Sequence, residues 1–107
     1  MKRGEVWWVA FDPSIGSEIR KTRPAVIVSN DLGNQHSKRV QVVPTSSNTE
    51  RVFPIEALVT VDGQQSKAMA DQLTTVDKQR LKSRIGELPP HELAALEKAI
   101  RIQLNLR

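Results

Sequence analysis

Short apolar runs, separated by polar or turn-forming residues, fill the first two thirds of the chain. The runs span residues 6–11, 25–29, 40–44, 57–61 and 67–74. Valine, isoleucine and aromatic residues are frequent in most of them, and such residues favour strands. Turn-forming pairs such as Asp62 and Gly63 end the runs. Four or five short strands with turns between them predict a small β-barrel or sandwich.

The predicted helices lie in the last third of the chain. Asp77 is a good N-cap for a short helix from Lys78 to about Arg84, which Gly86 would end. Pro90 suits the first turn of a longer final helix. The apolar stripe of that helix consists of Leu93, Leu96, Ile100 and Leu104. Residues 1–107 therefore predict one mainly β (α+β) domain with a short helix and a C-terminal α-helix.

Composition excludes several classes of site. Cysteine is absent, which excludes disulfide scaffolds, thiolate metal sites and cysteine nucleophiles. His36 and His91 have no metal-ligand spacing, and no GxxxxGK[ST] phosphate loop is present, so we expect neither a metal nor a cofactor. No apolar run approaches the ~20 residues of a membrane-spanning helix. The first residues do not resemble a signal peptide, so we expect a cytoplasmic protein.

The chain is basic, with 16 Lys and Arg against 12 Asp and Glu, a formal net charge of +4. The excess lies in residues 1–39 and 65–107, whereas residues 40–64 are acidic. A basic face built from both ends of the chain would attract a polyanion such as RNA. A charge of this size is also common in proteins that bind nothing acidic.

The segment 16–24 concentrates this charge. Three cations, Arg20, Lys21 and Arg23, lie within four positions, and Gly16 before them allows the backbone to bend. Pro24 favours an extended conformation of Arg23, which is therefore predicted at the junction of a loop and a strand. That position suits a fixed catalytic or anchoring group. The alternative is an ordinary solvated run of charges.

Five segments together have the pattern of a known family. They are residues 2–7 (KRGEVW), 16–18 (GSE), 22–30 (TRPAVIVSN), 43–47 (VPTSS) and 71–81 (DQLTTVDKQRL). In this order and spacing they resemble the MazF/PemK toxins, including the Kid branch. The resemblance implies a small SH3-like β-barrel with a C-terminal helix, assembled as a homodimer.

The activity that this resemblance implies is that of a sequence-specific endoribonuclease toxin of a type II toxin–antitoxin system. Such a toxin cleaves single-stranded RNA without a metal, leaves 2′,3′-cyclic phosphate and 5′-hydroxyl ends, and inhibits translation and growth. Its antitoxin covers the RNA site with an acidic C-terminal segment. The basic balance of this chain agrees with both partners.

Arg23 matches the catalytic arginine of the family, and Thr45 matches its catalytic threonine or serine. Because the 2′-hydroxyl of the RNA is the nucleophile, the protein has to orient the phosphate and stabilise its charge. The guanidinium of Arg23 suits the stabiliser or proton donor. The hydroxyl of Thr45 suits a hydrogen bond to a phosphate oxygen, although a threonine after a strand can also simply cap a turn.

Asp71 matches an aspartate that the Kid branch is thought to use in catalysis. This chain departs from that branch at two positions, with Ser17 in place of a histidine and Met69 in place of an arginine. The pair of Arg23 and Thr45 is therefore favoured over a histidine, arginine and aspartate set. Asp71 is predicted either to take part in catalysis or to orient Arg23 through an ion pair.

The other residues predicted to bind RNA are Ser17, Glu18, Arg20, Lys21, Ser46, Ser47 and Gln72. Lys38 and Arg39 are further candidates for phosphate contacts. Trp7 and Trp8 are adjacent, so in a strand they point to opposite faces. One indole is expected in the core, and the other is a core, dimer or base-stacking residue.

Two rival functions follow from the same pattern. The first is a non-catalytic toxin of the same barrel family that binds a protein target such as DNA gyrase. The second is a plain SH3-like module that binds RNA or a peptide. A pair of groups suited to a phosphate, Arg23 and Thr45, favours the endoribonuclease over the gyrase binder.

Overall fold

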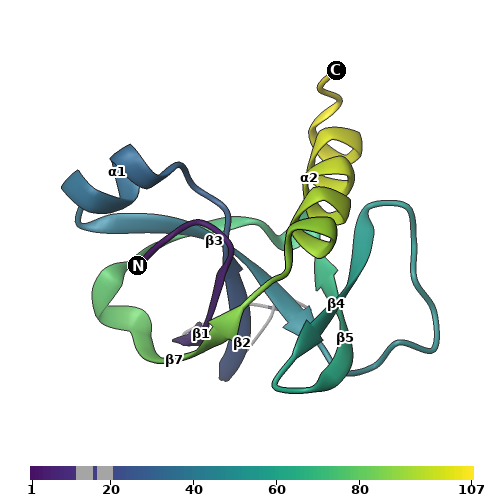
Figure 1. The fold of residues 1–107 in the computed structure, drawn as a ribbon, viewed down its shortest axis with the longest axis horizontal. Coiled ribbons are helices and arrows are strands. Elements are labelled where there is room, and N and C mark those ends of the chain that lie inside the picture. The colour runs from purple at the N-terminus through teal and green to yellow at the C-terminus, as the bar shows by residue number, and fades with distance from the viewer. Residues whose placement is uncertain (12–15, 17–20) are drawn as a thin grey trace.

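A computed structural model describes residues 1–11, 16 and 21–107 of the chain. Its elements are β1 (Glu5–Ala10), β2 (Thr22–Ile27), α1 (Asp31–His36), β3 (Arg39–Ser46), β4 (Glu56–Val61), β5 (Gln64–Met69), the 3-10 turn η1 (Ala70–Gln72), β6 (Thr74–Asp77), the 3-10 turn η2 (Lys78–Arg80), β7 (Leu81–Glu87) and α2 (Pro90–Leu104). Figure 1 shows the strands as one curled sheet, with α2 beside β4 and α1 at the opposite side.

The sheet is antiparallel and has the strand order β4-β5-β3-β2-β1-β7, with β6 paired to β3. The long strand β3 changes partner along its length. Its first half pairs with β6 through Arg39 to Val42, and its last two residues, Thr45 and Ser46, pair with β5. This change of partner curls the sheet into a half-barrel (Figure 1).

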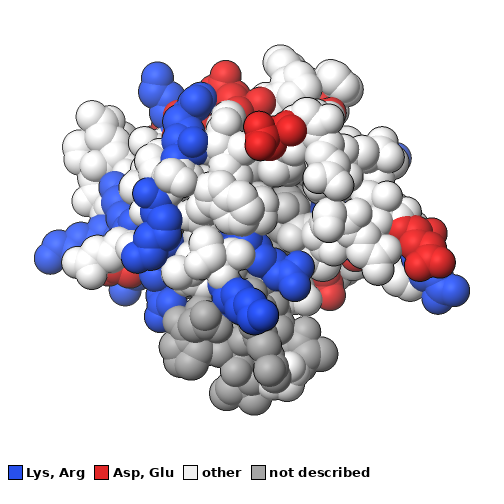
Figure 2. Space-filling view, turned by 90° about the horizontal axis from the view of Figure 1, so that it is seen from below, with Lys and Arg blue, Asp and Glu red and all other residues white. Residues whose placement is uncertain are grey.

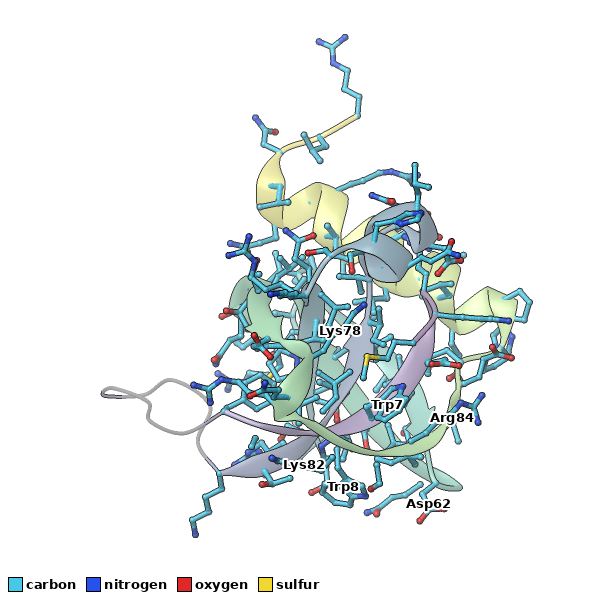
Figure 3. The ribbon with its side chains drawn as sticks, turned by 90° about the vertical axis from the view of Figure 1, so that its left-hand side faces the viewer. Trp7, Trp8, Asp62, Lys78, Lys82 and Arg84 are labelled. Carbon is cyan, nitrogen blue, oxygen red and sulfur yellow. The ribbon has the colours of Figure 1, made fainter. Side chains whose placement is uncertain are left out.

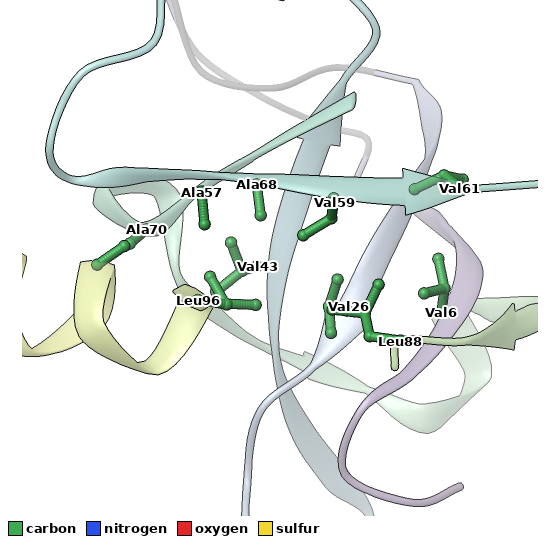
Figure 4. Packing of buried hydrophobic residues seen from close by; sticks show 11 residues of the cluster. Val6, Val26, Val43, Ala57, Val59, Val61, Ala68, Ala70, Leu88 and Leu96 are labelled. Carbon is green, nitrogen blue, oxygen red and sulfur yellow. The ribbon is translucent and has the colours of Figure 1, made fainter. Parts of the chain in front are cut away.

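Side chains alternate between two core clusters on the two faces of the sheet. The helix-side cluster lies between the two parts of the curled sheet and α2 and includes Val26, Val43, Val59 and Leu96 (Figure 4). The far-side cluster includes Val9, Ala25, Ile27, Val42 and Leu81. Because both faces of β2 and β3 are covered, the ends of these strands are rigid supports for any site placed there.

Local sequence explains where the helices begin and end. The side chain of Asn30 accepts a hydrogen bond from the N–H of Gly33 at 2.7 Å and caps α1. Pro90 begins α2, and Asn105 ends it in the left-handed conformation, with φ 57°. Among the described residues, no helix has both the length and the apolar character needed to cross a membrane.

The predicted mainly β fold with a C-terminal helix is confirmed, but the helix predicted at 78–84 is wrong. Asp77 does cap a helical turn, accepting a hydrogen bond from the N–H of Gln79 at 2.8 Å. That turn ends at Arg80, and the following residues form β7 along the free edge of β1. The ladder with β1 and the burial of Leu81 beside Val9 outweigh a weak helical pattern.

Two smaller boundaries also differ from the prediction. The run 67–74 is not one strand, because β5 ends at Met69 and η1 separates it from β6. Thr45 was expected after the end of its strand, but it lies inside β3, where pairing with β5 extends the strand.

Candidate active site

Arg23 is the second residue of β2, at the junction predicted from the proline that follows it. It pairs with Val9 of β1 and is half-buried. Its strand neighbours Ala25 and Ile27 belong to the far-side cluster, so alternation assigns the Arg23 side chain to that face. Pairing within the sheet therefore fixes the backbone of Arg23, and its long side chain extends from the start of the strand.

Thr45 lies on the neighbouring strand β3 and is only 3% exposed. Its Oγ1 donates a hydrogen bond to the carbonyl oxygen of Pro24 at 2.9 Å. It shares the helix-side face with Val43 and pairs with Ala68 of β5. The alternative of a turn cap is therefore wrong, because the hydroxyl joins two strands inside the sheet.

The bond from Thr45 to Pro24 places Arg23 and Thr45 on adjacent strand ends. The two side chains leave their strands on opposite faces of the sheet, as the membership of the two core clusters shows. For both groups to contact one phosphate, the long arginine side chain has to fold over the start of β2. The hydroxyl of Thr45 has to break its hydrogen bond to the Pro24 carbonyl and rotate toward the phosphate, or else act as a hydrogen-bond acceptor.

Asp71 and Gln72 lie in η1, directly after β5. Asp71 is exposed, and within the described part of the chain no ion pair joins it to Arg23. Met69, at the position of the arginine of the Kid branch, is buried. Asp71 therefore lies on the surface and is not ion-paired to Arg23.

Other predicted RNA contacts are divided between the two ends of β3. Ser46 lies beside Thr45, and its Oγ accepts a hydrogen bond from the N–H of Asn48 at 3.2 Å. Ser47 follows and is exposed. Arg39 begins the same strand six residues before Thr45, which corresponds to about 20 Å at the usual rise per residue. Lys38 and Arg39 therefore cannot contact the same nucleotide as Thr45.

Part of the predicted set cannot be placed. Ser17, Glu18 and Arg20 lie outside the described residues. Lys21 is described and exposed, and it has a left-handed backbone with φ 64°. Its carbonyl oxygen accepts a hydrogen bond from the N–H of Phe11 at 2.9 Å, which joins the end of β1 to the start of β2.

Three residues near the site were not predicted from the sequence. Lys82 and Arg84 are exposed cations on β7, and the wrong helix prediction hid their position beside β1. Ser66 is 5% exposed and lies on β5 two residues before Ala68, the partner of Thr45. No hydrogen bond of its hydroxyl to another described residue is present, and nothing in the sequence distinguishes this serine from a surface one.

Glu5 anchors the N-terminal strand beside these cations. Its carboxylate accepts hydrogen bonds from the Lys2 N–H at 2.9 Å, the Trp7 indole N–H at 3.0 Å and Arg84 Nε at 3.1 Å. Burial alone would raise the pKa of this carboxyl, but these donors together hold its pKa below the ordinary value of 4.5. A charged Glu5 therefore fixes both Trp7 and Arg84.

Lys and Arg side chains gather at the left and centre of the face seen in Figure 2, whereas acidic side chains lie mainly toward its upper and right-hand edges. The described cations Lys21, Lys82 and Arg84 are exposed. Within residues 1–11, 16 and 21–107, no group of three or more His, Asp or Glu side chains could hold a metal ion. The described charges suit an anionic ligand.

Fold and site together define a small half-barrel protein that carries an arginine and a buried threonine on adjacent strand ends. The family model of the PemK-like, MazF-like toxins of type II toxin–antitoxin systems matches residues 2–104. The chain belongs to this family, which confirms the resemblance seen in its motifs.

Similar proteins cover nearly the whole chain. Endoribonuclease MazF9 of Mycobacterium tuberculosis is 41% identical over 115 residues, covering 99% of this chain and 98% of the relative. Endoribonuclease EndoA of Bacillus subtilis is 29% identical, with 99% and 96% covered. MazF from Deinococcus radiodurans superimposes with a TM-score of 0.87 at 24% identity, covering 99% and 97%. An endoribonuclease from a mycobacterial species, solved with its cognate antitoxin, has a TM-score of 0.83 at 26% identity, covering 100% and 97%.

Proposed function

We propose that this protein is an endoribonuclease toxin that cleaves single-stranded RNA at specific sequences and is neutralised by a cognate antitoxin. The observation that carries the proposal is full-length similarity to a protein named as an endoribonuclease, 41% identical over 99% of this chain. The adjacent strand ends that carry Arg23 and Thr45 supply groups suited to the chemistry.

The proposed reaction uses the 2′-hydroxyl of the RNA as nucleophile. Its proton passes to a general base or to water as its oxygen attacks the adjacent phosphorus, the bond to the 5′-oxygen breaks, and the leaving oxygen takes up a proton. The products are a 2′,3′-cyclic phosphate and a 5′-hydroxyl. Arg23 neutralises the charge that grows on the phosphate oxygens and is a candidate donor to the leaving oxygen. No step needs a metal, since the guanidinium supplies the positive charge.

Thr45 would fix the phosphate for in-line attack. Its hydroxyl is held by the Pro24 carbonyl, which leaves the oxygen lone pairs available but requires rotation before the proton can reach a phosphate oxygen. Asp71, exposed on η1, is a less certain third catalytic group. RNA contacts come from Lys21, Ser46, Ser47 and Gln72, together with Ser17, Glu18 and Arg20.

The proposed assembly is a homodimer whose RNA site an acidic antitoxin segment can cover. Lys21 and Lys82 are exposed near the strand ends that carry Arg23 and Thr45, and they would attract either polyanion. The complex of a similar mycobacterial endoribonuclease with its antitoxin supports such a partner. Cleavage of cellular RNA would inhibit translation and growth.

The test uses purified protein with excess EDTA, a long RNA, and single-stranded DNA of the same sequence. We expect cleavage of the RNA alone at a repeated short motif, with 2′,3′-cyclic phosphate ends. Arg23→Ala and Thr45→Val should abolish turnover, whereas Thr45→Ser keeps the hydroxyl and should retain much of it. Urea denaturation of each variant separates loss of chemistry from loss of folding.

Two outcomes would contradict the proposal. Intact RNA in the presence of a protein that still arrests growth would indicate a non-catalytic toxin that binds a protein target. Full cleavage by both Arg23→Ala and Thr45→Val would keep the activity but refute these residues as its site.

Exposed Glu50, with no side-chain partner among the described residues, offers the matched control Glu50→Ala.

A further inference from the structure

The two adjacent tryptophans have opposite environments. Trp7 packs against the far-side cluster, and its indole N–H donates to Glu5 at 3.0 Å. Trp8 is 42% exposed, and its indole N–H has no hydrogen bond to another described residue. The fold of this chain covers more than half of the Trp8 side chain, and the exposed remainder of the indole is available to a ligand.

Trp8 lies in the same row of the sheet as Thr45. It pairs with Pro24 across β1 and β2, and the Pro24 carbonyl accepts the hydrogen bond from Thr45. Val6 and Val26, each two residues away along these strands, belong to the helix-side cluster, so Trp8 and Pro24 share that face with Thr45. Neighbouring strands are about 4.8 Å apart, which puts the backbones of Trp8 and Thr45 roughly 10 Å from each other.

One cation, Lys82, lies near the indole on the side of β7. The register between β1 and β7 shifts between Trp8 and Val9, so that Lys82 is the extra residue beside them. Figure 3 shows Lys82 next to Trp8, and Arg84 next to Trp7. Lys82 is exposed, and its Nζ is held by the carbonyl oxygen of Gln79 at 3.1 Å. An aromatic face beside an exposed lysine suits a nucleic-acid base with its phosphate.

Two grooves among the described residues lie away from Trp8. One runs beside α2 and is lined by residues such as Leu73, Ile100 and Leu104. The other lies between β4 and α2 and includes Leu58 and Ile102. Trp8 lines neither groove, so its exposure is not part of those surfaces.

We propose that Trp8 is a stacking surface for the base of a nucleotide next to the cleaved phosphate, and thus positions the RNA over Arg23 and Thr45. This inference rests on the proposed function. Base stacking on an aromatic ring strengthens binding roughly ten- to hundredfold and tolerates any base, because every base has a π-face. Trp8 therefore contributes affinity and position, whereas sequence specificity comes from other contacts.

The kinetic test compares the unmodified protein, Trp8→Ala and Trp8→Phe on a short RNA that contains one cleavage site. Trp8→Ala should raise KM roughly ten- to hundredfold, with a smaller effect on kcat, and Trp8→Phe should restore most of the lost affinity. Phe53→Ala is the matched control, since Phe53 is an aromatic ring that is 50% exposed and is not among the residues assigned to the site. It should leave KM unchanged.

A spectroscopic test does not depend on the stability of Trp8→Ala. The chain contains two tryptophans, so Trp7→Phe leaves Trp8 as the only one. Its fluorescence should be quenched by a 2′-O-methylated oligonucleotide of the cleavage sequence, which binds but cannot react. An abasic oligonucleotide of equal length should bind without this quenching.

Each result separates the inference from the function on which it rests. Absence of cleavage by the unmodified protein would refute the proposed function. Normal cleavage with unchanged KM in Trp8→Ala, or binding without quenching in Trp7→Phe, would refute only the role of Trp8. Conversion of an oligomer to a monomer by Trp8→Ala in sedimentation would assign the indole to a subunit contact and overturn the proposal.

Discussion

Replacing Glu5 by glutamine tests whether a buried charge holds the N-terminal strand. The carboxylate accepts three hydrogen bonds, from Lys2, Trp7 and Arg84, and its side chain is 11% exposed. Glutamine keeps an acceptor oxygen but loses the charge, and its NH2 group meets a donor on one side. Hydrogen bonds to a charged group contribute about 1.5–3 kcal/mol each, roughly twice the neutral value.

The expected loss of stability follows from the hydrogen bonds that glutamine keeps and weakens. Arg84 is half-exposed, so its bond contributes at most about 1 kcal/mol. Halving the other two bonds adds about 1.5 kcal/mol or more, and partial relaxation of the site reduces the sum. We expect Glu5→Gln to lower the free energy of unfolding by about 2 kcal/mol, which corresponds to a Tm lower by about 8–16 °C.

The effect should depend on pH in a defined direction. The pKa of Glu5 is lowered in the folded protein, so below the ordinary value of 4.5 the unfolded chain binds a proton that the folded one does not. Stability therefore rises with pH in this interval. The contribution of Glu5 is complete above about pH 5 and is lost as the pH falls through the folded pKa.

Urea denaturation followed by tryptophan fluorescence, at several pH values between 3 and 7, measures both effects. The difference between the unmodified protein and Glu5→Gln should shrink as the pH falls below 4.5. Glu50→Gln, an exposed glutamate, should match the unmodified protein throughout. A Glu5→Gln variant within about 0.5 kcal/mol of the unmodified protein at pH 7, or a constant difference at all pH values, would refute the reasoning.

Three further changes test individual features by urea denaturation. Lys21 has φ 64°, so Lys21→Gly should be more stable than Lys21→Ala by about 0.5–1 kcal/mol, and the reverse order would contradict the left-handed conformation. The carboxylate of Glu92 accepts two hydrogen bonds of 2.7 Å from one threonine of β4. Glu92→Ala should cost about 1–2 kcal/mol, against no measurable cost for the exposed Glu87→Ala. Leu96 is fully buried in the helix-side cluster, and Leu96→Ala should cost about 2–5 kcal/mol, so a smaller loss would show that the core is not packed as described.

The sequence predicted those elements whose own residues show an apolar periodicity. The run at 25–29 and the stripe of α2 as far as Ile100 are apolar because each packs against the core, and that periodicity is visible in the sequence, whereas Leu104 at the end of the predicted stripe is exposed. Residues 81–87 carry no such pattern, because most of their side chains are exposed and their strand is defined by pairing with β1. Pairing between opposite ends of the chain is not visible in the local sequence. The helix predicted from the Asp77 cap therefore extends into residues that form β7.

In the site, too, features set by local sequence were predictable and features set by strand pairing were not. Pro24 fixes the local conformation of Arg23, which the sequence predicted correctly. That Thr45 lies on the neighbouring strand and bonds to Pro24 depends on the register of β2 and β3, and only the family resemblance pointed to this threonine before the fold was known. The surroundings of Trp8, with Lys82 inserted by a register shift, depend on β7 and were not predictable.

The pairing of β1 with β7 also affects how the protein can be made. Glu5 pairs with Glu87, whereas β2 and β3, which carry Arg23 and Thr45, are close neighbours in the sequence. During synthesis β2 and β3 can therefore meet early, but one edge of β1 stays open until nearly the whole chain has left the ribosome. Chains that end before residue 81 lack β7 and expose an apolar strand edge, which favours aggregation and degradation. Only ribosomes that finish translation release the complete sheet, so prematurely terminated copies should not accumulate as folded protein.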